Sequence, residues 1–261
     1  MNPVSRTRPS LVASLRSALL WFVLAVIALS FCLCLPFFLL PRRVLKAIIA
    51  FHIKVGLKAM KLICALDWEL RGNPPAAGTA VLVASKHQSA WETFVLQCIL
   101  PDPAIILKRE LLLLPFFGWA LRKLKHLPID RAGGLESLRQ TIEAARLRVA
   151  EGRQIVIFPE GTRRDLGAPP AYQAGTFALY KSLAVPCLPA GLNSGGFWPH
   201  HGFIFRSGRI VIEFLPPIEP GLSREVFMRR LIQEIEGSSS RLLAEAAGSL
   251  AKPIDFEGQH D

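Results

Sequence analysis

A run of 23 uncharged and almost entirely apolar residues near the amino terminus constrains this chain more than any other feature. The run, ALLWFVLAVIALSFCLCLPFFLL, covers residues 18–40. As a helix rising about 1.5 Å per residue, it could cross the roughly 30 Å hydrocarbon core of a membrane. A cleaved signal peptide is the competing interpretation, but its apolar core would be shorter, and no A-x-A cleavage site follows. We therefore expect a retained membrane anchor.

Positive charge is concentrated in the same part of the chain. Residues 1–66 contain nine Lys or Arg and no Asp or Glu, whereas the rest is close to neutral and the whole chain carries +11. Lys54, Lys58 and Lys61 recur at the spacing of one helical face within residues 44–66. Another face carries the apolar residues Ile49, Ile53, Leu57 and Met60. The pattern predicts a basic amphipathic helix at an anionic membrane surface, with an ordinary surface helix as the alternative.

Pro36 and Pro41 stand between these two predicted helices and would bend the chain there. Both a full span and a hairpin that enters one leaflet fit this pattern, and either makes membrane lipids a partner. More positive residues follow the apolar run than precede it, which favours a body on the cytoplasmic side of the inner membrane. Because the charge lies on the lipid-like segment and no nucleic-acid motif is present, we expect no nucleic-acid partner.

The remaining sequence predicts one layered α/β domain after an amino-terminal helical membrane module. We place the module at residues 1–66 and the domain at residues 67–261. Five short apolar runs are typical of buried strands: Thr79–Ser85, Ala104–Leu107, Gln154–Phe158, Val185–Ala190 and Arg209–Leu215. Helical periodicity appears in Gly134–Gly152, and Glu225–Leu243 is a further expected helix. Alternating strands and helices indicate a central mixed sheet flanked by helices.

Two further features carry open interpretations. Leu111–Leu121, LLLLPFFGWAL, is either a core helix broken at Pro115 or an apolar surface that faces lipid or an acyl chain. The five cysteines, Cys32, Cys34, Cys64, Cys98 and Cys187, form no C-x-x-C pair, and the adjacent His200 and His201 have no obvious partner. We therefore expect no metal site, and a reducing compartment.

The first of three polar clusters follows the first predicted strand and contains His87 and Glu92. A histidine can accept a proton near neutral pH, and a carboxylate can fix its tautomer. Residues five apart do not face each other on a regular helix, so His87 must lie in the turn before a helix and Glu92 in its first turn. A capping box with Ser89 as N-cap and Glu92 at N3 would supply that geometry. The alternative is that Glu92 only caps the helix.

Two other polar clusters follow predicted strands, where α/β proteins tend to place their sites. Phe158 to Arg164, FPEGTRR, is a glycine-containing turn whose arginines suit phosphate binding, without the spacing of a Walker loop. Lys108, Arg109 and Glu110 precede the apolar eleven-residue run, so a cation stands at the edge of an apolar surface. Taken singly, each could be an ordinary surface cluster of charges.

Taken together, the clusters resemble the 1-acylglycerol-3-phosphate acyltransferases of the glycerolipid acyltransferase family. His87 to Glu92 resembles that family's H-x4-D block, with Glu92 in place of the usual aspartate. Lys108 to Glu110, with Pro115 and Gly118, is similar to the second block, and FPEGTR matches the third. The resemblance extends over roughly residues 68–220. It also includes Ile129-Asp130-Arg131, Val185 to Pro189, and Asn193-Ser194-Gly195.

The resemblance implies transfer of a fatty acyl group from a thioester to the sn-2 hydroxyl of lysophosphatidic acid, giving phosphatidic acid. His87 would be the general base and Glu92 its orienting carboxylate. Lys108 and Arg163 would bind the acceptor phosphate, and Glu160, Gly161 and Thr162 would shape that phosphate-binding turn. The co-substrate would be acyl-CoA or acyl-acyl carrier protein, with no bound cofactor. Acylation of another lysophospholipid or of glycerol-3-phosphate, a non-catalytic lipid-binding protein and a cationic membrane scaffold remain as alternatives.

Overall fold

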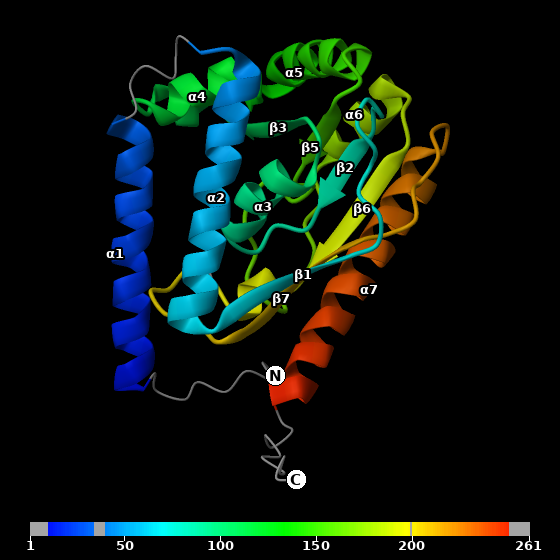
Figure 1. Ribbon diagram of the computed structural model, residues 1–261. Coiled ribbons are helices and arrows are strands. Elements are labelled where there is room, and N and C mark those ends of the chain that lie inside the picture. The colour runs from blue at the N-terminus through cyan, green and yellow to red at the C-terminus, as the bar shows by residue number, and fades with distance from the viewer. Residues whose placement is uncertain (1–9, 34–39, 199, 251–261) are drawn as a thin grey trace.

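A seven-stranded mixed sheet forms the centre of the molecule, with helices on both faces (Figure 1). The computed structural model describes residues 10–33, 40–198 and 200–250. The strands are β1 (Leu66–Arg71), β2 (Leu82–Ser85), β3 (Pro103–Lys108), β4 (Leu127–Ile129), β5 (Gln154–Ile157), β6 (Cys187–Leu192) and β7 (Gly208–Phe214). Their order is β1-β7-β6-β2-β5-β3-β4, and all neighbours are parallel except β6 and β7. The predicted fold class is confirmed.

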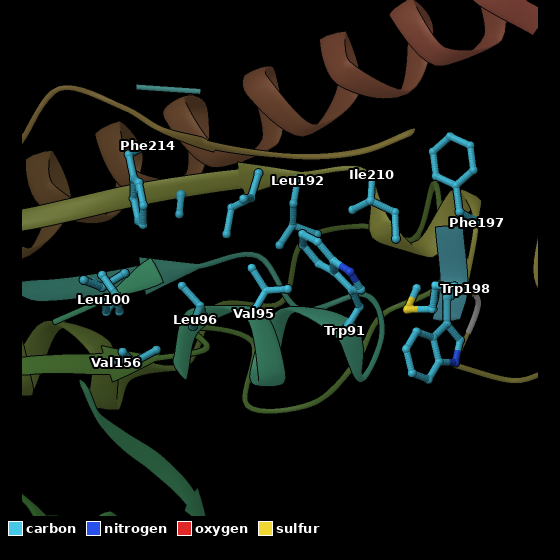
Figure 2. Packing of buried hydrophobic residues seen from close by; sticks show 14 of the residues in the cluster. Trp91, Val95, Leu96, Leu100, Val156, Leu192, Phe197, Trp198, Ile210 and Phe214 are labelled. Carbon is cyan, nitrogen blue, oxygen red and sulfur yellow. The ribbon is translucent and has the colours of Figure 1, made fainter. Parts of the chain in front are cut away.

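Each face of the sheet carries its own apolar layer, because successive side chains of a strand point to opposite sides. On one face, Val83 of β2 packs in a cluster with α2 (Arg42–Cys64) and α3 (Trp91–Ile99). Figure 2 shows this cluster around Trp91, Val95 and Leu192. On the other face, Leu82 and Ala84 of β2 pack with α5 (Gly134–Ala150), α6 (Ala174–Leu183) and α7 (Arg224–Leu250).

All five predicted strands are present, and two further strands lie at the sheet edges. β1 pairs only with β7, and β4 pairs only with β3. The expected helix over Gly134–Gly152 is α5, and the one over Glu225–Leu243 lies within the longer α7. The strand expected over Thr79–Ser85 begins only at Leu82.

The amino-terminal segments form two antiparallel helices, α1 (Leu11–Leu33) and α2, packed side by side (Figure 1). The apolar helix begins before residue 18 because the single charged residue Arg16 does not interrupt it. By length and composition alone, the segment Leu11–Cys32 is long and apolar enough to cross a membrane. Pro41 is the N-cap of α2, whereas Pro36 lies outside the described residues.

One face of α1 is exposed and the other belongs to the core. Leu20 and Trp21 join the apolar cluster of the sheet, and Trp21 Nε1 donates to the carbonyl of Phe203 at 2.9 Å. The opposite face exposes a stripe of large apolar side chains: Leu11, Leu15, Leu19, Phe22, Val26 and Leu29. One side of α1 is thus held by protein while the other is available to lipid.

The apolar stripe of α2 is turned toward the protein and not toward a membrane. Met60 is buried in the core cluster, and Leu57 packs against it. The amino-terminal end of α2 is tied to the body by Arg42, whose Nη2 lies 2.6 Å from Asp102 Oδ1. Lys54 and Lys58 lie on the exposed side, where Phe51, Val55 and Leu62 are also exposed. The predicted amphipathic pattern exists, but its apolar face forms part of the fold.

The apolar segment Leu111–Leu121 is not a core helix. It divides into a short 3-10 helix, η2 (Arg109–Leu113), and the short helix α4 (Phe117–Lys123). Leu113 is 76% exposed, and Leu114, Phe117 and Trp119 are also exposed. The inner side of α4 contributes Ala120 and Leu124 to a small cluster with Leu45 of α2. The second sequence interpretation, an apolar surface, therefore describes this segment better.

Candidate active site

The topology brings the three polar clusters to one edge of the sheet. β2, β5 and β3 are adjacent parallel strands, so their carboxyl ends meet at the same edge. His87 follows β2, the turn of residues 158–163 follows β5, and Lys108 ends β3. This edge is where open α/β sheets place their ligands.

The side chains of His87 and Glu92 meet as the sequence predicted. His87 lies in the turn before α3, Glu92 lies in the first turn of α3, and His87 Nδ1 is 2.8 Å from Glu92 Oε1. The carboxylate fixes the proton on Nδ1, which leaves Nε2 as the basic nitrogen available to a substrate hydroxyl. The catalytic role of this pair stays a prediction.

Glu92 is fully buried and surrounded by hydrogen-bond donors. Its Oε1 accepts from the backbone amides of Gln88 at 2.6 Å and Ser89 at 2.7 Å, in addition to His87. Its Oε2 accepts from the hydroxyls of Ser89 at 3.2 Å and Ser194 at 2.8 Å. Burial alone would raise the pKa of Glu92, but the hydrogen bond and charge of His87, together with the amide of Ser89, lower it below its usual value. Glu92 is therefore ionised at neutral pH.

The helix cap differs by one residue from the predicted capping box. Ala90 is the N-cap of α3, and Ser89 Oγ accepts from the amide of Trp91, two residues further on. Ala90 already has helical backbone angles, and the bond from the Trp91 amide to Ser89 Oγ is one that an N-cap residue makes, so the difference of one residue lies only in where the helix is counted to begin. The reciprocal contact, from the Ser89 amide to the Glu92 carboxylate, is nevertheless made.

The turn that follows β5 is attached directly to His87. The ring of Phe158 stacks on the imidazole of His87 with centroids 4.0 Å apart. The backbone amide of Arg164 donates to the His87 carbonyl at 3.0 Å. These two contacts hold the base and the predicted phosphate-binding turn in a fixed relation.

Within that turn, the predicted residues have different surroundings. Gly161 has φ +69°, a conformation that favours glycine, and its carbonyl accepts from the guanidinium of Arg131. Thr162 and Arg163 are exposed and line the cavity described below. Glu160 is buried, and its carboxylate lies 3.0 Å from Lys86 Nζ. The charge of Glu160 is thus engaged by protein, consistent with a role in shaping the turn.

Lys108 lies at the end of β3 and is half exposed. Its Nζ is 3.2 Å from Glu110 Oε1, and it lines the same cavity as Arg163. The neighbouring Arg109 is directed to Asp130, with 3.5 Å between Nη1 and Oδ2. Lys108 and Arg163 are therefore two cations beside one cavity, and their binding of a phosphate stays a prediction.

A cavity of about 1180 Å³ begins beside His87 and extends between the helices α1 and α2 and the body. Its volume exceeds the roughly 300–1,000 Å³ usual for small-molecule sites. Polar residues gather where His87, Lys108 and Arg163 line it, whereas its helical walls are mainly apolar. Those walls include Leu24, Ile27, Phe31, Ile49, Ile53 and Leu57. The arrangement suits a molecule with an anionic head and a long apolar chain.

The sequence analysis included Asn193-Ser194-Gly195 in the resemblance without a role in the site, but Ser194 belongs to the site. Its hydroxyl donates to Glu92 Oε2, and the amide of Gly195 donates to the side-chain carbonyl of Gln88 at 3.1 Å. A Cβ on Gly195 would lie only 3.0 Å from Gln88 Cβ, so any other residue here would push Gln88 aside by a few tenths of an ångström. Their position in the sequence could have indicated this role. Asn193 to Gly195 follow β6, which pairs in parallel with β2, so they lie at the same edge of the sheet as His87.

Comparisons with known proteins agree with this geometry. The acyltransferase family model matches residues 69–193. A 1-acyl-sn-glycerol-3-phosphate acyltransferase of Pseudomonas aeruginosa is 31% identical over 96% of this chain and 97% of its own length. The sheep 1-acyl-sn-glycerol-3-phosphate acyltransferase alpha is 29% identical over 64% of this chain and 59% of its own length.

The fold also has a solved counterpart. The crystal structure of the 1-acyl-sn-glycerophosphate (LPA) acyltransferase PlsC from Thermotoga maritima superposes with a TM-score of 0.68 at 21% identity, covering 88% of this chain and 99% of that one. The family model and the Pseudomonas aeruginosa relative define the class of this protein as an enzyme of acyl transfer. The chain belongs to the acyltransferase family.

Proposed function

We propose that this enzyme transfers a fatty acyl group from a thioester to the sn-2 hydroxyl of lysophosphatidic acid and forms phosphatidic acid, a step of phospholipid biosynthesis. The carrying observation is the His87–Glu92 pair, 2.8 Å apart, beside an apolar cavity that Lys108 and Arg163 also line. The names of the relatives from Pseudomonas aeruginosa and sheep support the choice of acceptor.

In the proposed reaction, Nε2 of His87 removes the proton of the acceptor hydroxyl as its oxygen attacks the thioester carbonyl carbon. Glu92 holds the tautomer and stabilises the imidazolium that results, the logic of a triad in which the acceptor alcohol replaces the serine. The tetrahedral intermediate then loses the thiolate, which takes the proton back from His87. The carbon–sulfur bond breaks as the new ester bond forms, and no covalent enzyme intermediate is needed.

Lys108 and Arg163 would hold the phosphate of the acceptor and so place its sn-2 hydroxyl near His87. Arginine and lysine both serve as phosphate ligands in proteins, arginine through two parallel hydrogen bonds. The apolar cavity would hold an acyl chain. The donor would be acyl-CoA or acyl-acyl carrier protein, used as a co-substrate, and this chemistry requires neither a metal nor a bound cofactor.

The proposed site of action is the membrane, where both acceptor and product reside. The exposed apolar stripe of α1 and the exposed leucines of η2 would enter the lipid, while Lys54 and Lys58 would face anionic head groups. Because α1 is covered on one side by protein, contact with one leaflet suits it better than a free span. Of the nine positive residues in the first 66, three precede the apolar run and six follow it, which favours the cytoplasmic face of the inner membrane.

The test is an acylation assay with the full chain in vesicles, using lysophosphatidic acid and either acyl-CoA or acyl-acyl carrier protein. Wild type should form phosphatidic acid, and His87→Ala should lower the rate by about 10²- to 10⁴-fold, as loss of a general base does. Acylation of only another lysophospholipid or of glycerol-3-phosphate would show that the acceptor is wrong. Absence of any acyl transfer would favour a non-catalytic lipid-binding protein.

A further inference from the structure

A buried ion cluster lies next to the catalytic turn and takes no part in the proposed proton transfer. Lys86 Nζ lies 2.7 Å from Glu236 Oε1 and 3.0 Å from Glu160 Oε2. The side chain of Lys86 is 6% exposed, that of Glu160 1% and that of Glu236 26%. The hydroxyl of Tyr172 donates to Glu236 Oε1 at 2.9 Å. We refer to Lys86, Glu160, Glu236 and Tyr172 as the lysine cluster.

The lysine cluster needs the charge of Lys86, because a carboxylate as buried as Glu160 is strongly destabilising without a cation beside it. Neither carboxylate oxygen of Glu160 has a hydrogen-bond partner of good geometry among the described residues. The ammonium of Lys86 is therefore its electrostatic compensation. Burial, with the charges of Glu236 and Glu160, raises the pKa of Tyr172, so its hydroxyl remains a donor.

The cluster joins three segments that are distant in sequence. Lys86 is adjacent to His87, Glu160 is in the turn that carries Arg163, and Glu236 is on α7, 150 residues after Lys86. Glu236 also lies beyond residues 69–193, which the family model matches. The carboxyl-terminal helix therefore contacts the catalytic and phosphate-binding turns through one lysine.

We propose that Lys86 and Glu236 are positioning residues for acyl transfer: Lys86 neutralises Glu160 and holds the turn bearing Arg163 against the His87 turn, and Glu236 fixes the ammonium of Lys86 in place. The inference rests on the proposed function, in which that turn binds the phosphate. Glu236 shares the charge of Lys86 with Glu160, so its contribution is positional: without the charge-assisted bond at 2.7 Å, the ammonium of Lys86 is less firmly placed and holds the turn that bears Glu160 less firmly. The turn then binds an anionic head group more weakly, while the apolar cavity and the His87–Glu92 pair keep their contacts.

The deciding variant is Glu236→Gln, which keeps the size of the side chain and removes its charge. The matched control is Glu245→Gln, nine residues further along the same helix, whose carboxylate lies 2.6 Å from Arg71 Nη1 and 2.8 Å from Arg241 Nη1. For both, steady-state kinetics with acceptor and donor varied separately are measured in vesicles, together with the thermal midpoint.

For Glu236→Gln, the KM for lysophosphatidic acid should rise about tenfold, the size expected for loss of one charge-assisted hydrogen bond. The kcat and the KM for the acyl donor should stay within about twofold. Glu245→Gln should leave all three constants near wild type. An unchanged acceptor KM in Glu236→Gln, or equal losses in both variants, would overturn the proposal.

A second pair of variants tests the charge balance at Glu160. Lys86→Met leaves Glu160 buried without a cation, whereas Lys86→Met/Glu160→Gln removes that charge as well. The double variant should recover acceptor affinity relative to Lys86→Met, and a further loss would contradict the proposal. If Lys86→Met does not fold, Glu236→Gln decides alone.

The proposed function and this inference fail in different ways. If wild type acylates another phosphate-bearing acceptor instead, the proposed acceptor is wrong, and the same comparison of variants is made with that acceptor. If wild type forms phosphatidic acid while Glu236→Gln behaves like Glu245→Gln, only the inference fails. A wild type that transfers no acyl group overturns both.

Discussion

Glu92 combines full burial with a charge, and five donors make this possible. The hydrogen bonds of His87, Gln88, Ser89 and Ser194 replace the water that the carboxylate loses. Such a carboxylate is rigid, and so is the imidazole that it orients. Glu92 has one methylene more than the aspartate of the H-x4-D block. Its longer side chain fits because the backbone amides of Gln88 and Ser89 donate to its carboxylate.

We predict that Glu92→Gln separates the chemistry from the fold. Glutamine keeps one acceptor oxygen but loses the charge that stabilises the imidazolium, so kcat should fall by about 10²-fold or more. The free energy of unfolding should fall by only about 1–3 kcal/mol. Phosphatidic acid formation and denaturant unfolding are the measurements.

Ser194→Ala is the control for Glu92→Gln, since it removes one donor to Glu92 Oε2 and keeps the charge. Its rate should stay within tenfold of wild type. A Glu92→Gln enzyme with nearly normal kcat would assign Glu92 to capping of α3 alone.

A second residue-scale prediction concerns His126, which is buried and lines the cavity. Its Nδ1 accepts from the amide of Ile105 at 3.0 Å. Burial, with the charges of Arg153 and Arg42, lowers the pKa of His126 to about 3. Because the unfolded histidine titrates near 6.5, the unfolded state binds more protons between these pH values, and stability falls as the pH drops below about 6.5.

The titration of His126 alone should lower the free energy of unfolding by about 2 kcal/mol when the pH is lowered from 7 to 5. The loss is about 1.4 kcal/mol for each pH unit below 6.5. His126→Gln should lose that part of the pH dependence, whatever its absolute stability. Unfolding at the two pH values checks the difference, and equal slopes in the two proteins would contradict it.

At the scale of elements, the exposed side chains of η2 and α4 should lie in the lipid. Trp119 is half exposed beside Phe116, whereas Trp68 packs against Trp91 in the core layer. We predict that brominated-chain lipids quench Trp119. The chain has five tryptophans, so Trp119→Phe should lower the lipid-quenched part of the fluorescence by about the contribution of one tryptophan.

Trp68→Phe is the matched control for that experiment, because it makes the same substitution at a site inside the protein. It should leave the lipid-quenched share unchanged. If the lipid-quenched share were the same in both variants, the η2–α4 segment would not lie at the membrane surface.

Sequence periodicity predicted the central strands because they are buried on both faces and are therefore continuous apolar runs. The two edge strands, β1 and β4, were not predicted in this way. β1, LDWELR, carries the polar–apolar alternation of a half-buried strand but is not a continuous apolar run, and β4 has only three residues, one of them Pro128. The His87–Glu92 contact was predictable because a local turn makes it. The contact between Lys86 and Glu236 was not, because only the packing of α7 against the sheet brings residues 150 positions apart together.

At the scale of the whole molecule, the amino-terminal helices have two roles at once. Their outer sides offer apolar and basic residues to a membrane, and their inner sides form walls of the cavity. A detachable anchor would have only the first role. The division into a module of residues 1–66 and a domain of residues 67–261 therefore remains a prediction, and it has a direct test.

We predict that residues 1–33 cannot be replaced by an unrelated single-span anchor. The fusion would remain membrane-bound, but it would lack Leu20 and Trp21 from the core and one wall of the cavity. Losses of large core side chains cost about 2–5 kcal/mol each, so its thermal midpoint should fall clearly. Without that wall the acyl chain would be displaced from its place beside His87, so the fusion should form phosphatidic acid about 10²-fold more slowly.

The control for the fusion changes only the outer stripe of α1, with Leu15, Leu19, Phe22, Val26 and Leu29 replaced by alanine. This protein keeps the inner contacts, so it should unfold like wild type in detergent while it binds vesicles more weakly. If the fusion were instead fully active and as stable as wild type, α1 would be a simple tether. The opposite result, with a stable stripe variant and an inactive fusion, would show that the membrane-facing helix is also part of the catalytic domain, because the acyl cavity has no closed wall without it.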